Sequence, residues 1–187
     1  MDDTRSRLIT SAQELLWERG YTATSPRAIQ SRAGAGQGSM YHHFTGKADL
    51  AGAAIRRTAE EMTPGARSRL DGPGSPLERL RAYLRVERDV LRGCRLGRLV
   101  QDQDVVTDPH LLEPIDAVFS GTIARLAEVL REAQEAGEVR ADADPDQVAA
   151  TLVAVIQGGY VLARAHGSTE RYTAAIEGVL SLVTTGP

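Results

Sequence analysis

Polar side chains with nucleic-acid-binding chemistry gather around residue 40 of this chain. Tyr41, His42 and His43 follow a run of small polar residues, and Lys47 comes four positions after His43. Tyrosine, histidine and lysine can hydrogen-bond to phosphate oxygens or to the edges of bases. These residue types and their spacing predict contact with DNA.

Two short helices are predicted to position these side chains. The first, about residues 25–33, begins with a serine N-cap followed by proline and ends at a glycine. The second, about residues 37–44, follows after only three residues, which is the spacing of a helix-turn-helix. Met40 and Phe44 are four residues apart, so both are expected to face the core and anchor the second helix.

The predicted contact residues lie at the exposed starts of both helices and just beyond the second. They are Ser25, Arg27, Gln37, Gly38, Ser39, Tyr41, His42, His43 and Lys47. For Tyr41, simple packing stays open as an alternative. His42 and His43 could instead bind a metal ion, but adjacent helical side chains diverge by about 100° and no third ligand is apparent. No metal site is predicted.

Charge is unevenly distributed along the chain. The net charge is −3, from 22 basic and 25 acidic residues. Residues 1–47 carry six basic and four acidic side chains, a net of +2, which leaves −5 for residues 48–187. A basic head on an acidic body favours DNA contact at one end only. Cys94 is the single cysteine, so no internal disulfide is predicted, and it is expected to be a buried small hydrophobe.

The sequence predicts a protein of the cytoplasm without a membrane-spanning segment. No run approaches the roughly eighteen apolar residues that a bilayer requires. The first residues are acidic and lead into an amphipathic pattern, unlike a signal peptide.

Helical periodicity recurs throughout the chain, and no strand-like alternation of any length occurs, so the predicted fold class is all-α. The expected helices cover about residues 5–19, 25–33, 37–44, 47–62, 76–92, 96–106 and 109–136, followed by two that begin near residues 145 and 168. Residues 63–76 are rich in proline and glycine and are predicted to be a surface linker. The predicted domain boundary lies after residue 50, with the helix-turn-helix in residues 1–50 and a larger helical domain in residues 51–187.

Other polar residues offer little for catalysis. Asp102, Asp104 and Glu113 could act as paired carboxylates, but no nucleophile or base stands beside them, so a solvated surface is the preferred interpretation. The sequence has no catalytic triad, metal-ligand set or phosphate-binding loop. We therefore predict neither an enzyme nor a cofactor.

Two consecutive glycines, Gly158 and Gly159, interrupt a helical pattern near the C-terminus. Each costs about 1 kcal/mol relative to alanine in a helix. Close approach of a helix across a dimer interface and space for a ligand are the two explanations that stay open.

The segment Met40–Leu50 (Met-Tyr-His-His-Phe-Thr-Gly-Lys-Ala-Asp-Leu), with Ser25–Ile29 and Ala33–Gly36, resembles the N-terminal domain of the TetR family of transcriptional regulators. The resemblance covers about residues 5–55. It implies about nine helices, with an N-terminal helix-turn-helix that binds double-stranded operator DNA. It also implies a homodimer formed through the last two helices. Residues 93–97 are similar to the C-terminal domains of the LmrA/YxaF-like subgroup.

The resemblance further implies a repressor that a small apolar effector releases from its operator. Tyr83, Phe119, Gln157 and Tyr160 could line the effector site, although each also suits core packing. The coupling would run through the helix of residues 47–62. The alternative from another class is a helical small-molecule sensor or protein-interaction module without DNA binding.

The turn departs from the family pattern. Gln30 and Ala35 stand where alanine and valine are usual, and we expect both to weaken turn packing slightly.

Overall fold

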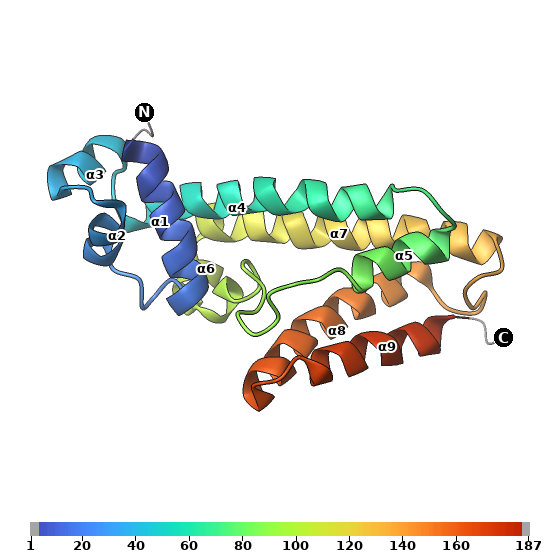
Figure 1. Cartoon of the computed structure of the whole chain (residues 1–187). Coiled ribbons are helices and arrows are strands. Elements are labelled where there is room, and N and C mark those ends of the chain that lie inside the picture. Colours follow the sequence, from blue (N-terminus) through green and yellow to red (C-terminus); the bar gives the residue numbers. More distant parts are fainter. Residues whose placement is uncertain (1–3, 185–187) are drawn as a thin grey trace. The chain divides into compact units, whose positions relative to one another are not determined.

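The computed structural model describes residues 4–184, and most of them lie in helices (Figure 1). The elements are α1 (Thr4–Arg19), α2 (Pro26–Ala33), α3 (Gln37–His43), α4 (Lys47–Leu70), α5 (Pro76–Leu84), η1 (Leu99–Gln101), α6 (Gln103–Val106), α7 (Pro109–Glu135), α8 (Pro145–His166) and α9 (Glu170–Val183). Within residues 4–184 the only extended pairing is an isolated bridge between Val139 and Thr184. The all-α prediction is confirmed.

The chain packs as two compact units. Unit 1 contains residues 1–61 and 94–117, and unit 2 contains residues 62–93 and 118–187. The chain therefore passes between the units at three places: within α4, after Gly93 and within α7. These units are defined by packing, whereas the boundary predicted at residue 50 separates functions, so that boundary stays a prediction.

Local capping signals set most helix ends as predicted. The Ser25 hydroxyl oxygen accepts a hydrogen bond from the amide of Ala28, and Gly34 ends α2 in the left-handed conformation with φ of 59°. Ser75 and Glu78 form the predicted capping box at the start of α5. At the start of α8, the Asp144 side chain accepts hydrogen bonds from two backbone amides. Each signal acts within four residues, which is why the sequence reveals it.

The linker prediction for residues 63–76 is wrong in its first half. Helix α4 continues through Pro64 to Leu70, so only residues 71–75 connect it to α5. Proline removes one backbone hydrogen bond. Burial of Leu70 in the core of unit 2 and a hydrogen bond from the Arg69 guanidinium to the Gly65 carbonyl favour the helix beyond it.

Helix α5 is shorter than predicted and ends at Leu84. The guanidinium of Arg88 donates hydrogen bonds to the carbonyl groups of Tyr83, Leu84 and Val86. An arginine side chain thus satisfies carbonyls that a continuing helix would pair with backbone amides.

Unit 2 depends on the packing of α8 against α9, which lie side by side (Figure 1). Buried residues of α8 include Leu152, Ile156 and Gly159, and those of α9 include Tyr172 and Ile176. A Cβ atom at Gly159 would lie 2.8 Å from the ring of Tyr172, whereas one at Gly158 would meet nothing within 4 Å. Close helix packing within the chain therefore explains Gly159, and Gly158 faces outward.

We expect Gly159→Ala to destabilise unit 2 relative to Gly121→Ala. Both replace a helical glycine, but Gly121 is exposed with open space around its Cα, whereas the new methyl at Gly159 would crowd Tyr172. The Gly121 variant should gain up to about 1 kcal/mol from helix propensity. The Gly159 variant should be about 1–3 kcal/mol less stable than it, because of overpacking. Thermal unfolding at equal protein concentration measures the difference, and equal midpoints would contradict the packing argument.

Helix α8 is also long and apolar enough, by length and composition, to cross a membrane. This differs from the prediction that no segment is apolar enough to span a membrane. One face of α8 is buried against the core of unit 2, while Val161 and Leu162 on the other are 66% and 46% exposed. A single helix that meets this test is weak evidence for a membrane span.

Candidate nucleic-acid interface

Helices α2 and α3 form a helix-turn-helix braced by α1 (Figure 1). The turn is three residues long, and the amide of Ala35 donates to the carbonyl of Gln30 across it. On the outside, the Arg32 guanidinium pairs with both carboxylate oxygens of Glu18 on α1 at 2.8 and 2.9 Å. The Arg32–Glu18 ion pair therefore fixes the first helix of the motif to α1.

Gln30 makes a contact with α3 that the sequence did not predict. Its side-chain amide donates a hydrogen bond to the sulfur of Met40 at 3.2 Å. Met40 is fully buried, so this contact ties α2 to the core side of α3. A polar residue at this position compensates through a contact that alanine could not make.

The buried and exposed sides of α3 divide as the motif requires. Met40 and Phe44 are buried, as predicted. Gln37 and Gly38 are exposed at the start of the helix, and Tyr41 is 52% exposed. A side chain as large as tyrosine pointing outward has little packing role. The polar start of α3 is thus accessible to a binding partner.

The remaining predicted contact residues surround α3. Ser25 and Arg27 are exposed at the start of α2, and the Ser25 oxygen that caps the helix still carries a proton to donate. Lys47 is the first residue of α4, and its ammonium lies 4.0 Å from the centre of the Tyr21 ring. The structure places all nine predicted residues in unit 1.

His42 and His43 lie closer together than the helical rotation suggested. Their rings are in edge-to-face contact, with centroids 5.0 Å apart. His42 is exposed, while His43 is half-buried and also contacts the Phe44 ring. Within residues 4–184, no group of three or more histidine, cysteine, aspartate or glutamate side chains is arranged to hold a metal ion.

Two arginines near the N-terminus were missed as contact candidates. The guanidinium of Arg5 lies 5.4 Å from the centre of the Phe44 ring, at the end of α3. Arg7 lies beside the turn, with its guanidinium 3.7 Å from where a side chain at Gly34 would begin. Both are exposed and add positive charge beside the motif. Their distance from the motif in sequence hid this, and only the net charge of the head signalled it.

The interpretation of Asp102 as a solvated carboxylate is wrong. It is half-buried and accepts a hydrogen bond from the backbone amide of Tyr21, whereas Asp104 and Glu113 are exposed. Cys94 is half-buried rather than buried, and its sulfur accepts a hydrogen bond from the Gly97 amide.

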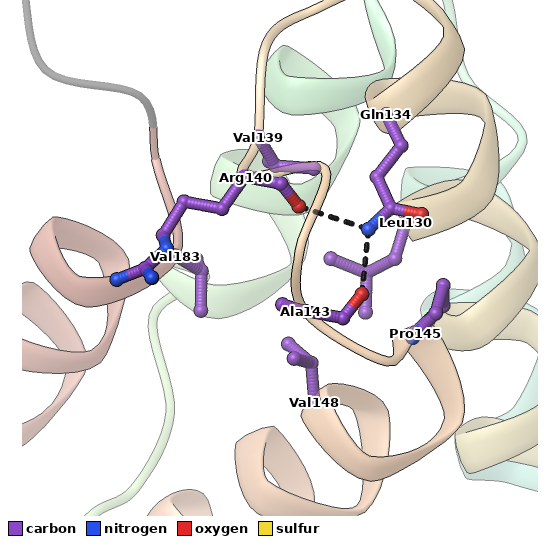
Figure 2. A pocket seen from close by; sticks show the side chains of 8 residues that line it. All are labelled: Leu130, Gln134, Val139, Arg140, Ala143, Pro145, Val148 and Val183. Carbon is purple, nitrogen blue, oxygen red and sulfur yellow. Dashed lines mark hydrogen bonds between the residues drawn. The ribbon is translucent and has the colours of Figure 1, made fainter.

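The four predicted effector-site residues all lie in unit 2. Tyr83, Phe119 and Tyr160 are partly buried and pack against one core cluster, and Gln157 is half-buried on α8. Figure 2 shows a pocket of unit 2 that none of these four residues lines. It is lined by Leu130, Gln134, Val139, Arg140, Ala143, Pro145, Val148 and Val183.

That pocket is too small for an effector. It encloses about 190 Å³ including space open to solvent, whereas drug-sized ligands occupy about 300–1,000 Å³. The Gln134 side chain crosses it to donate hydrogen bonds to the carbonyls of Arg140 and Ala143. Gln134 thereby holds the loop that precedes α8.

A braced three-residue turn and an exposed polar start on its second helix define a DNA-binding protein of the helix-turn-helix class. The comparison with known sequences narrows this class. Residues 8–54 match the profile described as bacterial regulatory proteins, tetR family, and residues 75–179 match that of the tetracyclin repressor-like C-terminal domain. The chain belongs to the TetR family of transcriptional regulators, and the proteins that it matches are regulators rather than enzymes.

Individual relatives agree with this assignment. Transcriptional regulator AcuR of Cereibacter sphaeroides is 34% identical over 150 residues, 76% of this chain and 68% of that protein. The transcriptional repressor DhaR of a Mycobacterium species is 27% identical, over 82% of this chain and 79% of that one. A crystal structure of a regulatory protein TetR from Rhodobacter sphaeroides superposes with a TM-score of 0.85 at 29% identity, over 95% of this chain and 97% of that chain.

The comparisons do not favour the LmrA/YxaF-like subgroup over other members of the family. LmrA and YxaF of Bacillus subtilis are 27% and 26% identical, each over 86% of this chain and over 86% and 84% of their own length, which is no closer than DhaR.

Proposed function

We propose that this regulator is a cytoplasmic repressor that binds a near-palindromic operator as a homodimer, and that a small apolar effector releases it. The observation that carries the DNA-binding surface is the split of α3 into buried anchors, Met40 and Phe44, and an exposed polar side. The N-terminal residues of a recognition helix are those that reach base edges in the major groove. Gln37 would read bases, and Tyr41 and Lys47 would contact phosphates.

The dimer would form through the outer faces of α8 and α9. Val161 on α8 and Leu182 on α9 are 66% and 71% exposed, among the most exposed large apolar side chains of residues 4–184. Gly158 and Gly178 have open space around them, which suits close approach of another helix. A two-fold dimer would present its two recognition helices to major grooves about 34–36 Å apart.

The effector would contact Tyr83, Phe119, Gln157 and Tyr160. These residues supply an apolar wall with few polar groups, which is typical of small-molecule sites. DhaR, which is named a repressor, supports the direction of regulation. Besides α4, residues 94–117 pack in the unit that contains the helix-turn-helix and offer a further route for coupling.

We expect Lys47→Ala to weaken binding to every DNA sequence. If Lys47 makes one phosphate contact, the slope of log affinity against log salt should fall by about one unit. Tyr41→Ala should weaken binding in the same way, whereas Gln37→Ala should change base preference by about 1–3 kcal/mol at one position. Binding is measured with the duplex that the wild-type protein selects from a random-sequence pool.

The matched control is Arg56→Ala. It removes the same charge from an exposed position on the same helix, outside the predicted surface, and should leave the salt slope unchanged. Lys47 is the only lysine of the chain, so amine acylation followed by peptide mapping reports on this one side chain, and operator DNA should protect it. Folded Lys47 and Tyr41 variants that bind like the wild type would contradict the assigned surface. A wild type that binds no duplex would support the DNA-independent sensor instead.

A further inference from the structure

The carboxylate of Asp102 holds the turn between α1 and α2. Its oxygens accept hydrogen bonds from the backbone amides of Tyr21 at 2.7 Å and Thr22 at 3.4 Å. Asp102 occupies the N-cap position of α6, yet its side chain makes no hydrogen bond to that helix. The carboxylate is therefore committed to a turn 81 residues away in sequence.

The turn is shaped to receive this carboxylate. Gly20 has φ of +80°, a conformation that other residues rarely adopt. A Cβ atom there would lie 2.7 Å from a carboxylate oxygen of Asp102, so any side chain at residue 20 would displace it. Burial opposes the charged form of Asp102, but hydrogen bonds from Thr22 and Tyr21 and the charge of Lys47 outweigh it and lower the pKa. Asp102 is ionised at neutral pH.

The segment that carries Asp102 is also anchored to α1 and α4. Arg95 forms ion pairs with Glu14 on α1 at 3.9 Å and with Glu61 on α4 at 3.3 Å. Its guanidinium also lies 5.2 Å from the Trp17 ring. Two residues, Arg95 and Asp102, thus fix this segment to α1, to α4 and to the turn that follows α1.

Tyr21 connects this turn to the predicted DNA surface. The Tyr21 side chain is 8% exposed, so its ring has a fixed position. The ammonium of Lys47 lies 4.0 Å from the centre of that ring, within the range of a cation–π contact. The three residues form a chain of contacts from the carboxylate of Asp102, through Tyr21, to the ammonium of Lys47.

We propose that Asp102 is a positioning residue for DNA binding: it fixes Tyr21, whose ring holds the Lys47 ammonium at the start of α4. The inference rests on the phosphate contact proposed above for Lys47. It extends the DNA-binding machinery beyond residues 8–54, the segment that matches the N-terminal family profile.

The test compares Asp102→Asn with Asp104→Asn. Asp104 is an exposed carboxylate whose charge also acts on Tyr21, so the control removes the same charge from the same neighbourhood. Removing a negative charge near bound phosphates strengthens binding by general electrostatics. Loss of positioning acts in the opposite direction. We expect Asp104→Asn to bind the selected duplex as tightly as the wild type or more tightly, and Asp102→Asn about tenfold more weakly.

Two further measurements separate positioning from a purely structural role. The salt slope of Asp102→Asn should fall by about one unit, as for Lys47→Ala. In a Lys47→Ala background, Asp102→Asn should cause no further loss, because the two changes remove one contact. Tyr21→Leu keeps the backbone amide but removes the ring, and should reproduce the loss even if Asp102→Asn does not fold.

The outcomes distinguish the two proposals. If Lys47→Ala weakens binding but folded Asp102→Asn binds like Asp104→Asn, the role of Asp102 is overturned and the phosphate contact stands. Additive losses in the double variant would also overturn it. If Lys47→Ala itself binds like the wild type, both proposals fail.

Discussion

Glutamate in place of Val161 and Leu182 is expected to convert the regulator into a monomer that binds its operator about 100- to 10,000-fold more weakly. Both side chains lie on the outer face of the α8–α9 pair and are mostly exposed, so the change should leave the core of unit 2 intact. Two charges on each copy would oppose burial of this face. Loss of the second half-site contact removes the gain from bivalent binding, which sets the magnitude. Sedimentation at micromolar concentration measures assembly, and a binding titration measures affinity.

The control places the same charge on another helix. Ala124 is exposed on α7, so Ala124→Glu should leave assembly and binding unchanged. Truncation before Asp144 is a less informative test, because α8 and α9 supply core residues such as Leu152 and Ile176. A folded Val161/Leu182 double variant that still forms dimers would place the interface elsewhere. A monomer that binds the operator tightly would refute the link between assembly and binding.

The second large effect concerns the effector. A small apolar molecule that binds unit 2 and weakens operator binding must itself bind more weakly in the presence of operator, by the same factor, typically about 5–150-fold. A compound that raises the thermal unfolding midpoint is titrated by calorimetry with and without the selected duplex. Equal ligand affinity in the two titrations would rule that compound out as an inducer.

Variants at the proposed effector site locate the binding. Tyr160→Ala and Gln157→Ala should lower the affinity for the ligand. Both variants should keep the wild-type operator affinity when no ligand is present. Val148→Ala, in the small pocket of Figure 2, is the matched change in the same unit and should leave ligand affinity unaltered. If only Val148→Ala lowers the affinity for the ligand, the ligand binds at that pocket and the assigned effector site is wrong.

Much of the fold could be predicted because its signals are local. Ser25, Gly34, Ser75 and Asp144 mark helix ends through hydrogen bonds or backbone conformations that involve residues within four positions. The burial of Met40 and Phe44 follows from their spacing on one helix. These features indicated the helix-turn-helix, and the resemblance of residues 40–50 to the TetR family indicated the family. The roles of the nine predicted contact residues and of the dimer face stay predictions.

Tertiary structure decided what depends on distant partners. Pro64 predicted a helix end, but burial of Leu70 in unit 2 and the Arg69 contact favour a helix that continues past it. Gly158 and Gly159 are identical in sequence terms, and only the position of Tyr172 distinguishes them.

The same reason explains the error at Asp102. A carboxylate in a polar stretch is most often solvated, and nothing within several residues of Asp102 indicates a partner. The backbone amides that it binds belong to a turn 81 positions earlier, and their orientation depends on Gly20. Hydrogen bonds to backbone amides carry no residue-type signature, because nearly every residue has the same N–H group. Sequence determined the helix-turn-helix motif, and only folding determined which distant carboxylate holds the turn that precedes it.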